Sequence, residues 1–244
     1  IEDTCESLGS KYRKSYLGSI GDFSSFSFYS SHQISSGEGG MVTCRTSEDY
    51  EIMKSLRSHG WSRGLKNEKK IAKKNKNLDK KFIFINSGFN LRPTDISAAI
   101  GLSQFKKLDK FINIRSQNRD RIKKYFDNEK ILKNNIKIVN ESKHVTPSWF
   151  GISLIIINEK LDKFRLINNL EKNGIETRPI ISGNFADQPS IKLYNIKHDN
   201  YFPNAENVYN SGFFIGLPFR KISKKKINNL INLFIICIKA SIKK

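Results

Sequence analysis

Cysteines are few in this chain, and the three that it has lie far apart. Cys5, Cys44 and Cys237 form an odd, scattered set with none of the spacings typical of a metal site. Ligation of an iron–sulfur cluster by four cysteines is therefore excluded for these residues. Free thiols are typical of the reducing cytoplasm, so we expect a cytoplasmic protein without a bound metal.

Long apolar runs are also missing. No stretch approaches the roughly 18 to 20 apolar residues that a membrane-spanning helix needs, and the longest near the end, residues 233–238, has the length of a core segment. No secretory signal pattern is visible, so we expect no membrane association. The chain begins at Ile1, and residues 1–5 have the pattern of a strand end. We therefore expect a fragment that lacks its N-terminal part.

Acidic residues are scarce beside basic ones. The chain has 43 Lys and Arg against 23 Asp and Glu, a formal net charge of +20, and a local excess lies in residues 66–81, which we expect to be a solvated loop. Most of the basic residues are Lys, and Asn and Ile are also abundant. A base-composition bias in the genome would produce the same enrichment in these three residues. With no nucleic-acid-binding motif visible, a basic nucleic-acid-binding module is kept only as an alternative, which steeply salt-dependent binding would support.

The most informative stretch runs from residue 24 to residue 42. The aromatic residues Phe26 and Phe28 alternate with serines, small hydroxyl residues lead to His32, and a Gly-Glu-Gly-Gly turn at 37–40 precedes an apolar run from Met41. The pattern predicts a strand, a polar loop, a tight turn and a second strand. Such a layout places a few polar side chains at the end of a sheet, where small ligands often bind.

The rest of the chain alternates helix and strand patterns, which indicates an α/β fold. We expect a helix over residues 47–58 with Ser47 as N-cap, and a long helix from Asp95 to about Phe126 opened by Pro93 and Thr94, with a wide apolar face. Further segments are expected as strands over 148–157, 175–181 and 213–217, and as helices over 160–173 and 223–241. We expect two domains, residues 1–127 and 128–244.

Several motifs resemble the DegT/DnrJ/EryC1/StrS family of sugar aminotransferases over nearly the whole chain. They are the 24–42 stretch, His-Gly-Trp-Ser-Arg at 59–63, Gly-Phe-Asn at 88–90, Ser-Trp-Phe-Gly at 148–151 and Gly-Ile-Glu-Thr-Arg-Pro-Ile at 174–180. The resemblance implies the aspartate-aminotransferase-like fold (type I) that binds pyridoxal 5'-phosphate (PLP), with a partial large domain and a C-terminal small domain. It also implies a homodimer with shared active sites.

One position departs from most of the family. The lysine that binds PLP covalently is replaced by His32, which has no primary amine but exchanges protons near neutral pH. A histidine here is similar to a branch of nucleotide-sugar 3-dehydratases. That likeness implies removal of the C3 hydroxyl of a GDP-linked 4-keto-6-deoxyhexose in deoxysugar (O-antigen) biosynthesis, with pyridoxamine 5'-phosphate (PMP) loaded from glutamate. An aminotransferase with an unusual base and a purely structural histidine remain alternatives, and we expect the fragment alone to be inactive.

The resemblance implies roles for four further residues around the cofactor. It pairs Asp3 with the pyridine nitrogen, where a carboxylate keeps the ring protonated, and places Ser7 near the ring oxygen. Ser27 would reach the phosphate, and Asn90 would reach the phosphate of the neighbouring subunit. From the residues alone, Asp3 is equally well a loop or cap acid, and Ser27 a serine on a strand's polar face.

Three residues are candidates for binding substrate. His59 would contact substrate or cofactor, Arg63 would face a phosphate, and Arg178 would bind a carboxylate or phosphate bidentately. A surface salt bridge is an equally good interpretation of Arg178, as core packing is of Trp61.

Overall fold

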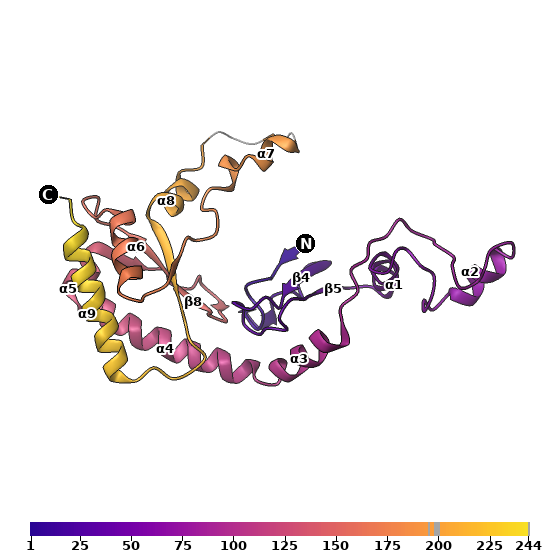
Figure 1. The fold of residues 1–244 in the computed structure, drawn as a ribbon, viewed down its shortest axis with the longest axis horizontal. Coiled ribbons are helices and arrows are strands. Elements are labelled where there is room, and N and C mark those ends of the chain that lie inside the picture. The colour runs from indigo at the N-terminus through magenta and orange to yellow at the C-terminus, as the bar shows by residue number, and fades with distance from the viewer. Residues whose placement is uncertain (195, 198–200, 244) are drawn as a thin grey trace. The chain divides into compact units, whose positions relative to one another are not determined.

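A computed structural model describes residues 1–194, 196–197 and 201–243 of the chain. It is a mixed α/β structure, as the sequence predicts (Figure 1). The described residues form two compact units, residues 1–108 with 144–147, and residues 109–143 with 148–244. The expected domain division after residue 127 concerns the complete protein and remains a proposal.

The first unit contains a small sheet with the strand order β1-β4-β5. β1 (Glu2–Asp3) runs parallel to β4 (Phe23–Ser27), and β4 pairs antiparallel with β5 (Gly40–Cys44). The strand, loop, turn and strand predicted for residues 24–42 are therefore confirmed. The Glu2 carboxylate accepts hydrogen bonds from the backbone N–H groups of Gly18, Ile20 and Gly21 at 2.6–2.8 Å, which hold the loop before β4 against β1.

A second sheet in this unit consists of three short strands. β2 (Lys11–Tyr12) lies between β3 (Ser15–Tyr16) and β7 (Val145–Thr146) and pairs antiparallel with both. This pairing brings residues 145–146, which are distant in sequence, into the first unit.

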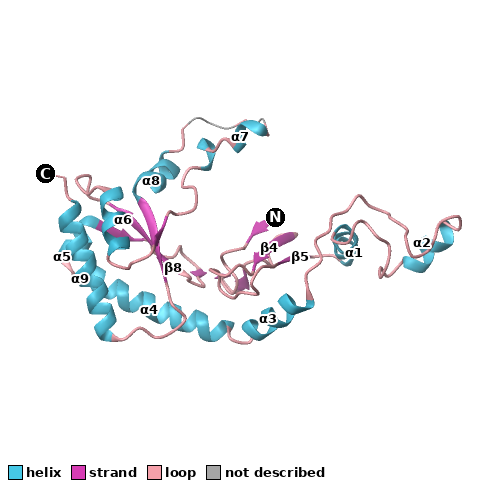
Figure 2. Ribbon diagram, viewed as in Figure 1, coloured by secondary structure: helices cyan, strands magenta, loops and turns pink. Residues whose placement is uncertain are grey.

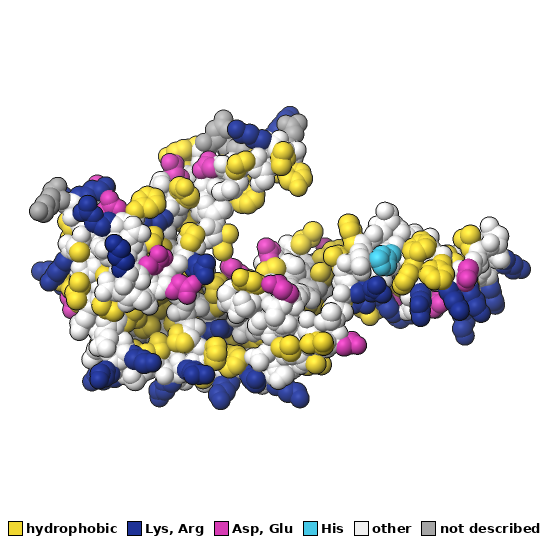
Figure 3. Space-filling model, viewed as in Figure 1, with side chains coloured by type: hydrophobic (Ala, Val, Ile, Leu, Met, Phe, Trp, Pro, Cys, Tyr) yellow, Lys and Arg dark blue, Asp and Glu magenta, His cyan; other side chains and the backbone are white. Residues whose placement is uncertain are grey.

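Two helices follow β5 in the first unit. α1 (Ser47–Leu56) confirms the predicted helix, but its N-cap is Thr46, whose hydroxyl accepts from the Asp49 N–H at 3.0 Å, and not Ser47. α2 (Glu68–Lys74) lies within the segment 66–81. The solvated loop expected there is therefore partly helical. None of the helix residues is buried, and lysines gather on the surface around α2 (Figure 3).

The predicted long helix is two helices, α3 (Asp95–Phe105) and α4 (Leu108–Asn128), separated at residues 106–107. Thr94 caps α3, as a hydroxyl residue at the start of the helical pattern predicts. The expectation of a wide packed face is wrong for α3, which has no buried residue: Ile96 is 75% exposed and Leu102 is 67% exposed.

The second unit is built on an antiparallel sheet with the strand order β6-β8-β10-β9 (Figure 2). The strands are β6 (Ile136–Ile138), β8 (Gly151–Ile156), β10 (Gly212–Gly216) and β9 (Thr177–Arg178). β9 is shorter than the strand expected over residues 175–181. Pro179, which has no N–H to donate, directly follows its last residue.

Helices complete the second unit around this sheet. They are α5 (Lys130–Asn135), α6 (Lys163–Lys172), α7 (Ser190–Leu193), α8 (Pro203–Ser211) and α9 (Lys224–Ser241), with a 3-10 turn at Phe185–Asp187. α6 packs against α9, and the core includes the fully buried Leu154, Leu166, Phe213 and Phe234. Burial of each such side chain contributes about 1.5–3 kcal/mol, so this unit has a substantial core of its own.

Polar side chains fix α4 to the segment that follows β10. Within the second unit, the Arg115 guanidinium donates to the Leu217 carbonyl at 3.2 Å, and the Asn118 amide donates to the carbonyls of Pro218 and Arg220 at 3.1 and 2.8 Å.

A membrane-spanning helix would need to be both long and apolar, and none of the helices in the described part of the chain meets both conditions.

Candidate active site

The carboxyl ends of β1 and β4 meet at one edge of the first sheet, because the two strands are parallel. The segments that leave these ends touch. Thr4 donates its N–H and its hydroxyl to the Ser25 carbonyl at 3.0 and 2.6 Å, and the Gln33 amide donates to the Glu6 carbonyl at 2.6 Å. The sheet topology therefore brings residues 3–7 and 27–33 together.

His32 lies in the loop that leaves β4, and contacts with Tyr29 and Glu6 define its place. Its backbone N–H donates to the Tyr29 carbonyl at 3.1 Å, and the Tyr29 ring meets the imidazole edge-on with 5.8 Å between ring centroids. Nε2 of His32 is 3.8 Å from a carboxylate oxygen of Glu6. The side chain is only 12% exposed, so the imidazole is held at this edge of the sheet.

The glycine turn after His32 is fixed by Ser36. The Ser36 N–H donates to the Phe28 carbonyl at 3.0 Å, and its hydroxyl donates to the Glu38 carbonyl at 2.9 Å. Gly39 has a φ of 152°, and a Cβ there would lie 2.7 Å from the Ser36 hydroxyl oxygen. Only glycine fits without displacing Ser36, so the Gly-Glu-Gly-Gly motif shapes the loop that returns the chain to β5.

The Asp3 carboxylate ends β1 on the surface of the same edge. It accepts hydrogen bonds from the Cys5 N–H at 3.2 Å and from the Ser25 hydroxyl at 3.4 Å. The hydrogen bonds from the Cys5 side chain and backbone, with a smaller contribution from Ser25, lower the pKa of Asp3. Asp3 is therefore ionised well below neutral pH and is accessible to a cationic partner.

The two serines predicted to bind a cofactor lie in the same segments. The Ser27 hydroxyl accepts from the Tyr29 N–H at 3.3 Å. The Ser7 N–H donates to the Thr4 carbonyl at 3.0 Å, which places Ser7 in the turn after β1. The structure thus gathers Asp3, Ser7, Ser27 and His32 at one sheet edge.

A second group of residues surrounds the crossing of segments 58–61 and 84–90. The His59 N–H donates to the Phe89 carbonyl at 2.7 Å, and Ser58 forms a β-bridge with Asn90. The His59 ring lies 5.2 Å from the Trp61 ring, which also contacts Phe82 and Phe84. His59 and Asn90 are therefore neighbours at this crossing.

The two candidate arginines are both exposed. Arg63 lies in the loop after Trp61. Arg178 belongs to the second unit, is 67% exposed, and forms an ion pair with Glu176 at 2.6 Å. The surface salt bridge weighed from the sequence is thus present at Arg178, while its role in binding substrate remains a prediction.

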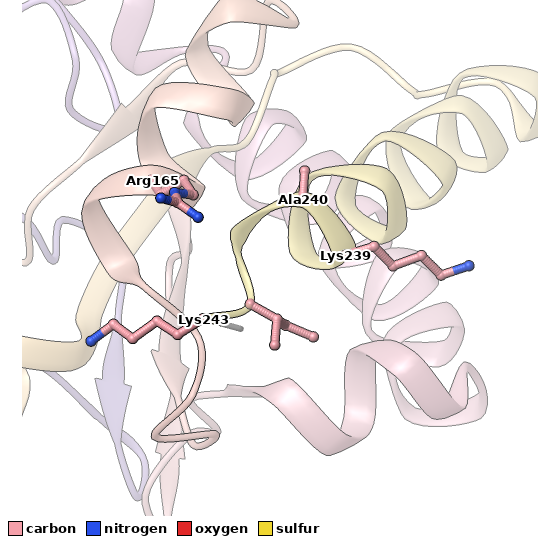
Figure 4. Close-up of a pocket in the computed structure, with 5 residues that line it drawn as sticks. Arg165, Lys239, Ala240 and Lys243 are labelled. Atoms are coloured by element: carbon pink, nitrogen blue, oxygen red, sulfur yellow. The ribbon is translucent and has the colours of Figure 1, made fainter.

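A pocket in the second unit does not form a competing site. It is lined by Ala240, Ile242 and three basic residues, Arg165, Lys239 and Lys243. The basic side chains point in different directions rather than toward one point (Figure 4). Among the described residues, no group of His, Cys, Asp and Glu is arranged to hold a metal ion.

Sequence reasoning missed Glu6, the carboxylate that faces His32. Its side chain is 42% exposed and its backbone is bound by Gln33, which is itself buried. Only the sheet topology would have pointed to Glu6. Because β1 and β4 are parallel, the residues that follow β1, including Glu6, lie beside the residues that follow β4, including His32. Sequence patterns alone do not reveal the pairing of β1 with β4 on which this placement depends.

Known proteins resemble this chain over most of its length. A GDP-4-keto-6-deoxy-D-mannose 3-dehydratase of Escherichia coli O55:H7 is 34% identical over 220 residues, which are 88% of this chain and 55% of that protein. A GDP-perosamine synthase of Escherichia coli O157:H7 is 29% identical over 228 residues, 93% of this chain and 55% of that protein. A solved structure of GDP-4-keto-6-deoxymannose-3-dehydratase with a trapped PLP-glutamate geminal diamine matches with a TM-score of 0.83 and 30% identity, over 94% of this chain and 59% of that one.

The fold is thus that of the PLP-dependent enzymes of the aspartate-aminotransferase type, fold type I. The model of the DegT/DnrJ/EryC1/StrS aminotransferase family matches residues 1–234, and the chain belongs to this family. The chain spans between one half and three fifths of the length of these three relatives.

Proposed function

We propose that the complete protein is a PLP- and PMP-dependent nucleotide-sugar 3-dehydratase that removes the C3 hydroxyl of a GDP-linked 4-keto-6-deoxyhexose. The observation that carries the proposal is His32, held at the sheet edge in place of the family's lysine. The likeness to a protein named GDP-4-keto-6-deoxy-D-mannose 3-dehydratase supports it. Glutamate is the proposed amino donor, in line with the PLP-glutamate adduct in the structure of a relative.

The residues at the sheet edge fit this cofactor chemically. Asp3 is ionised, as a partner for a protonated pyridine nitrogen must be, and it is accessible on the surface. The hydroxyls of Ser7 and Ser27 are neutral donors suited to the ring oxygen and the phosphate. We propose that Asn90 reaches the phosphate bound by a second subunit. His32 lacks a primary amine, so this position offers no covalent attachment.

The chain's own residues then divide the work of the reaction. When bound, the pyridoxamine form supplies the amine that joins the sugar's 4-keto carbon and a ring that accepts electrons. His32 takes a proton from the carbon that carries the amine and delivers a proton to the departing C3 hydroxyl. Asp3 holds the pyridine nitrogen, while His59, Arg63 and Arg178 are proposed to bind the sugar nucleotide.

A second candidate is a nucleotide-sugar aminotransferase of the same family. The similarity to a GDP-perosamine synthase favours it. The two activities differ in their products, since the dehydratase releases ammonia and a 3-deoxy sugar, whereas the aminotransferase leaves the nitrogen on an aminosugar. Without a lysine to complete transamination, we favour the dehydratase.

The first test of the proposal is that the cofactor is bound without a covalent bond. We expect the complete protein, treated with borohydride and then denatured, to show only the mass of its polypeptide. His32→Lys is the matched positive control, because it restores an amine at the same position. A cofactor adduct on any lysine of the parent would contradict the proposal.

A second prediction concerns shared active sites. If Asn90 serves the neighbouring subunit, His32→Asn and Asn90→Ala homodimers should each be impaired. After unfolding and refolding together, mixed dimers should regain activity, because one of their two sites contains both native residues. Sedimentation of the complete protein measures whether it is a dimer. Site sharing would be refuted by a monomer with full activity, or by mixtures of the two variants that gain no activity.

A further inference from the structure

We propose that Glu6 is a positioning residue for His32, which holds the imidazole in one orientation and one tautomer. The inference rests on the proposed acid–base role of His32. It concerns a carboxylate to which the sequence motifs assign no function, and which the fold brings to the imidazole from another segment of the chain.

The first observation is the geometry of the pair. A carboxylate oxygen of Glu6 lies 3.8 Å from Nε2 of His32. This is an ion-pair contact and longer than a direct hydrogen bond. Hydrogen bonds of catalytic groups are often long in ligand-free structures and shorten when substrate binds. The Glu6 side chain is half-exposed and the imidazole is nearly buried, so the carboxylate approaches from the solvent side.

The second observation is that the backbone of Glu6 is itself fixed. The amide of Gln33, the residue after His32, donates to the Glu6 carbonyl at 2.6 Å. Gln33 is only 1% exposed. The two loops are therefore joined immediately beside the ion pair, and this anchor keeps the carboxylate near the imidazole.

The third observation is the shape of the surroundings of His32. Tyr29 meets the ring edge-on, with an angle of 69° between the ring planes, and its carbonyl fixes the backbone of His32. Aromatic packing on one side and a carboxylate at Nε2 together define a ring orientation.

This arrangement has a specific chemical consequence. A carboxylate at Nε2 favours the orientation and tautomer in which that nitrogen carries the proton. A histidine and carboxylate pair acts in this way in serine hydrolases. Glu6 would act only through His32.

The test compares Glu6→Gln, Glu6→Asp and the matched control Asp22→Asn in the complete protein. Asp22 is an exposed carboxylate of the same unit, paired with Arg45 at 3.9 Å. We expect Glu6→Gln to lower kcat for ammonia release by at least about tenfold with KM for the sugar nucleotide little changed. Glu6→Asp should recover part of the rate, and Asp22→Asn should match the parent. A Glu6→Gln enzyme with parental kcat would overturn the proposal.

A second measurement separates this inference from the proposed function. Nitrogen-15 NMR of the His32 ring reports the tautomer without any turnover. We expect the fraction of the Nε2-protonated form to be the same in the parent and in Asp22→Asn, and to be lower in Glu6→Gln. Unchanged spectra in Glu6→Gln would refute the positioning role, even in a dehydratase. If the parent released no ammonia while Glu6→Gln still changed the tautomer of His32, the dehydratase proposal alone would be refuted.

Discussion

His32→Asn in the complete protein is expected to lower the rate of ammonia release by about 100- to 10,000-fold, the usual cost of removing a positioned acid–base group. Asparagine has a similar reach and still forms hydrogen bonds, but it does not exchange protons near neutral pH. Binding of the sugar nucleotide should survive, because other residues are proposed to hold the nucleotide. The rate is measured as ammonia released from a GDP-linked 4-keto-6-deoxyhexose in the presence of glutamate.

The complementary variant His32→Lys tests the same position from the opposite side. A primary amine there should attach PLP covalently and move the protein toward transamination, so that aminosugar appears. Turnover of His32→Asn within a few-fold of the parent would mean that His32 is structural. The dehydratase proposal would then lose its main support.

Gly88→Ala is expected to lower the stability of the first unit strongly. A Cβ at Gly88 would lie 2.2 Å from the Gly60 nitrogen and 2.7 Å from the Leu56 carbonyl oxygen. Both are backbone atoms, which cannot move as a flexible side chain can. We expect the free energy of unfolding to fall by about 3 kcal/mol. Urea denaturation of the complete protein measures this loss.

Gly101→Ala is the matched control for this substitution. It also adds one methyl group to the first unit, but in the helix α3, where the nearest atom is the Ser36 Cβ at an ordinary 3.6 Å. Alanine favours a helix over glycine by about 1 kcal/mol, so this variant should be as stable as the parent or more stable. Equal effects of the two substitutions would contradict the close backbone crossing that brings His59 and Asn90 together.

Local patterns predicted the elements of the fold well where one segment alone decides the structure. The period-2 aromatics around Phe26 and the start of a helix after Thr94 are such cases. The break between α3 and α4 and the short β9 were missed. At Lys106 and Lys107 the sequence carries neither proline nor glycine, so no local signal marks the end of the first helix.

The site was predictable in its residue types but not in its assembly. His32 and the glycine turn are visible as a motif, whereas Glu6 reaches His32 only because β1 and β4 are parallel neighbours. Strand pairing depends on contacts distant in sequence, which periodicity does not report. Arg178 illustrates the opposite case, because its ion pair with Glu176 joins residues only two positions apart in the sequence.

The most direct test of the account is the fate of the amino nitrogen. The complete protein is supplied with glutamate labelled with nitrogen-15 and a GDP-linked 4-keto-6-deoxyhexose. Both candidate reactions produce 2-oxoglutarate, so only the nitrogen-containing product distinguishes them. The account predicts one labelled ammonia for each 3-deoxy-4-keto sugar formed, with no label on the sugar. Labelled aminosugar without free ammonia would contradict it and identify an aminotransferase.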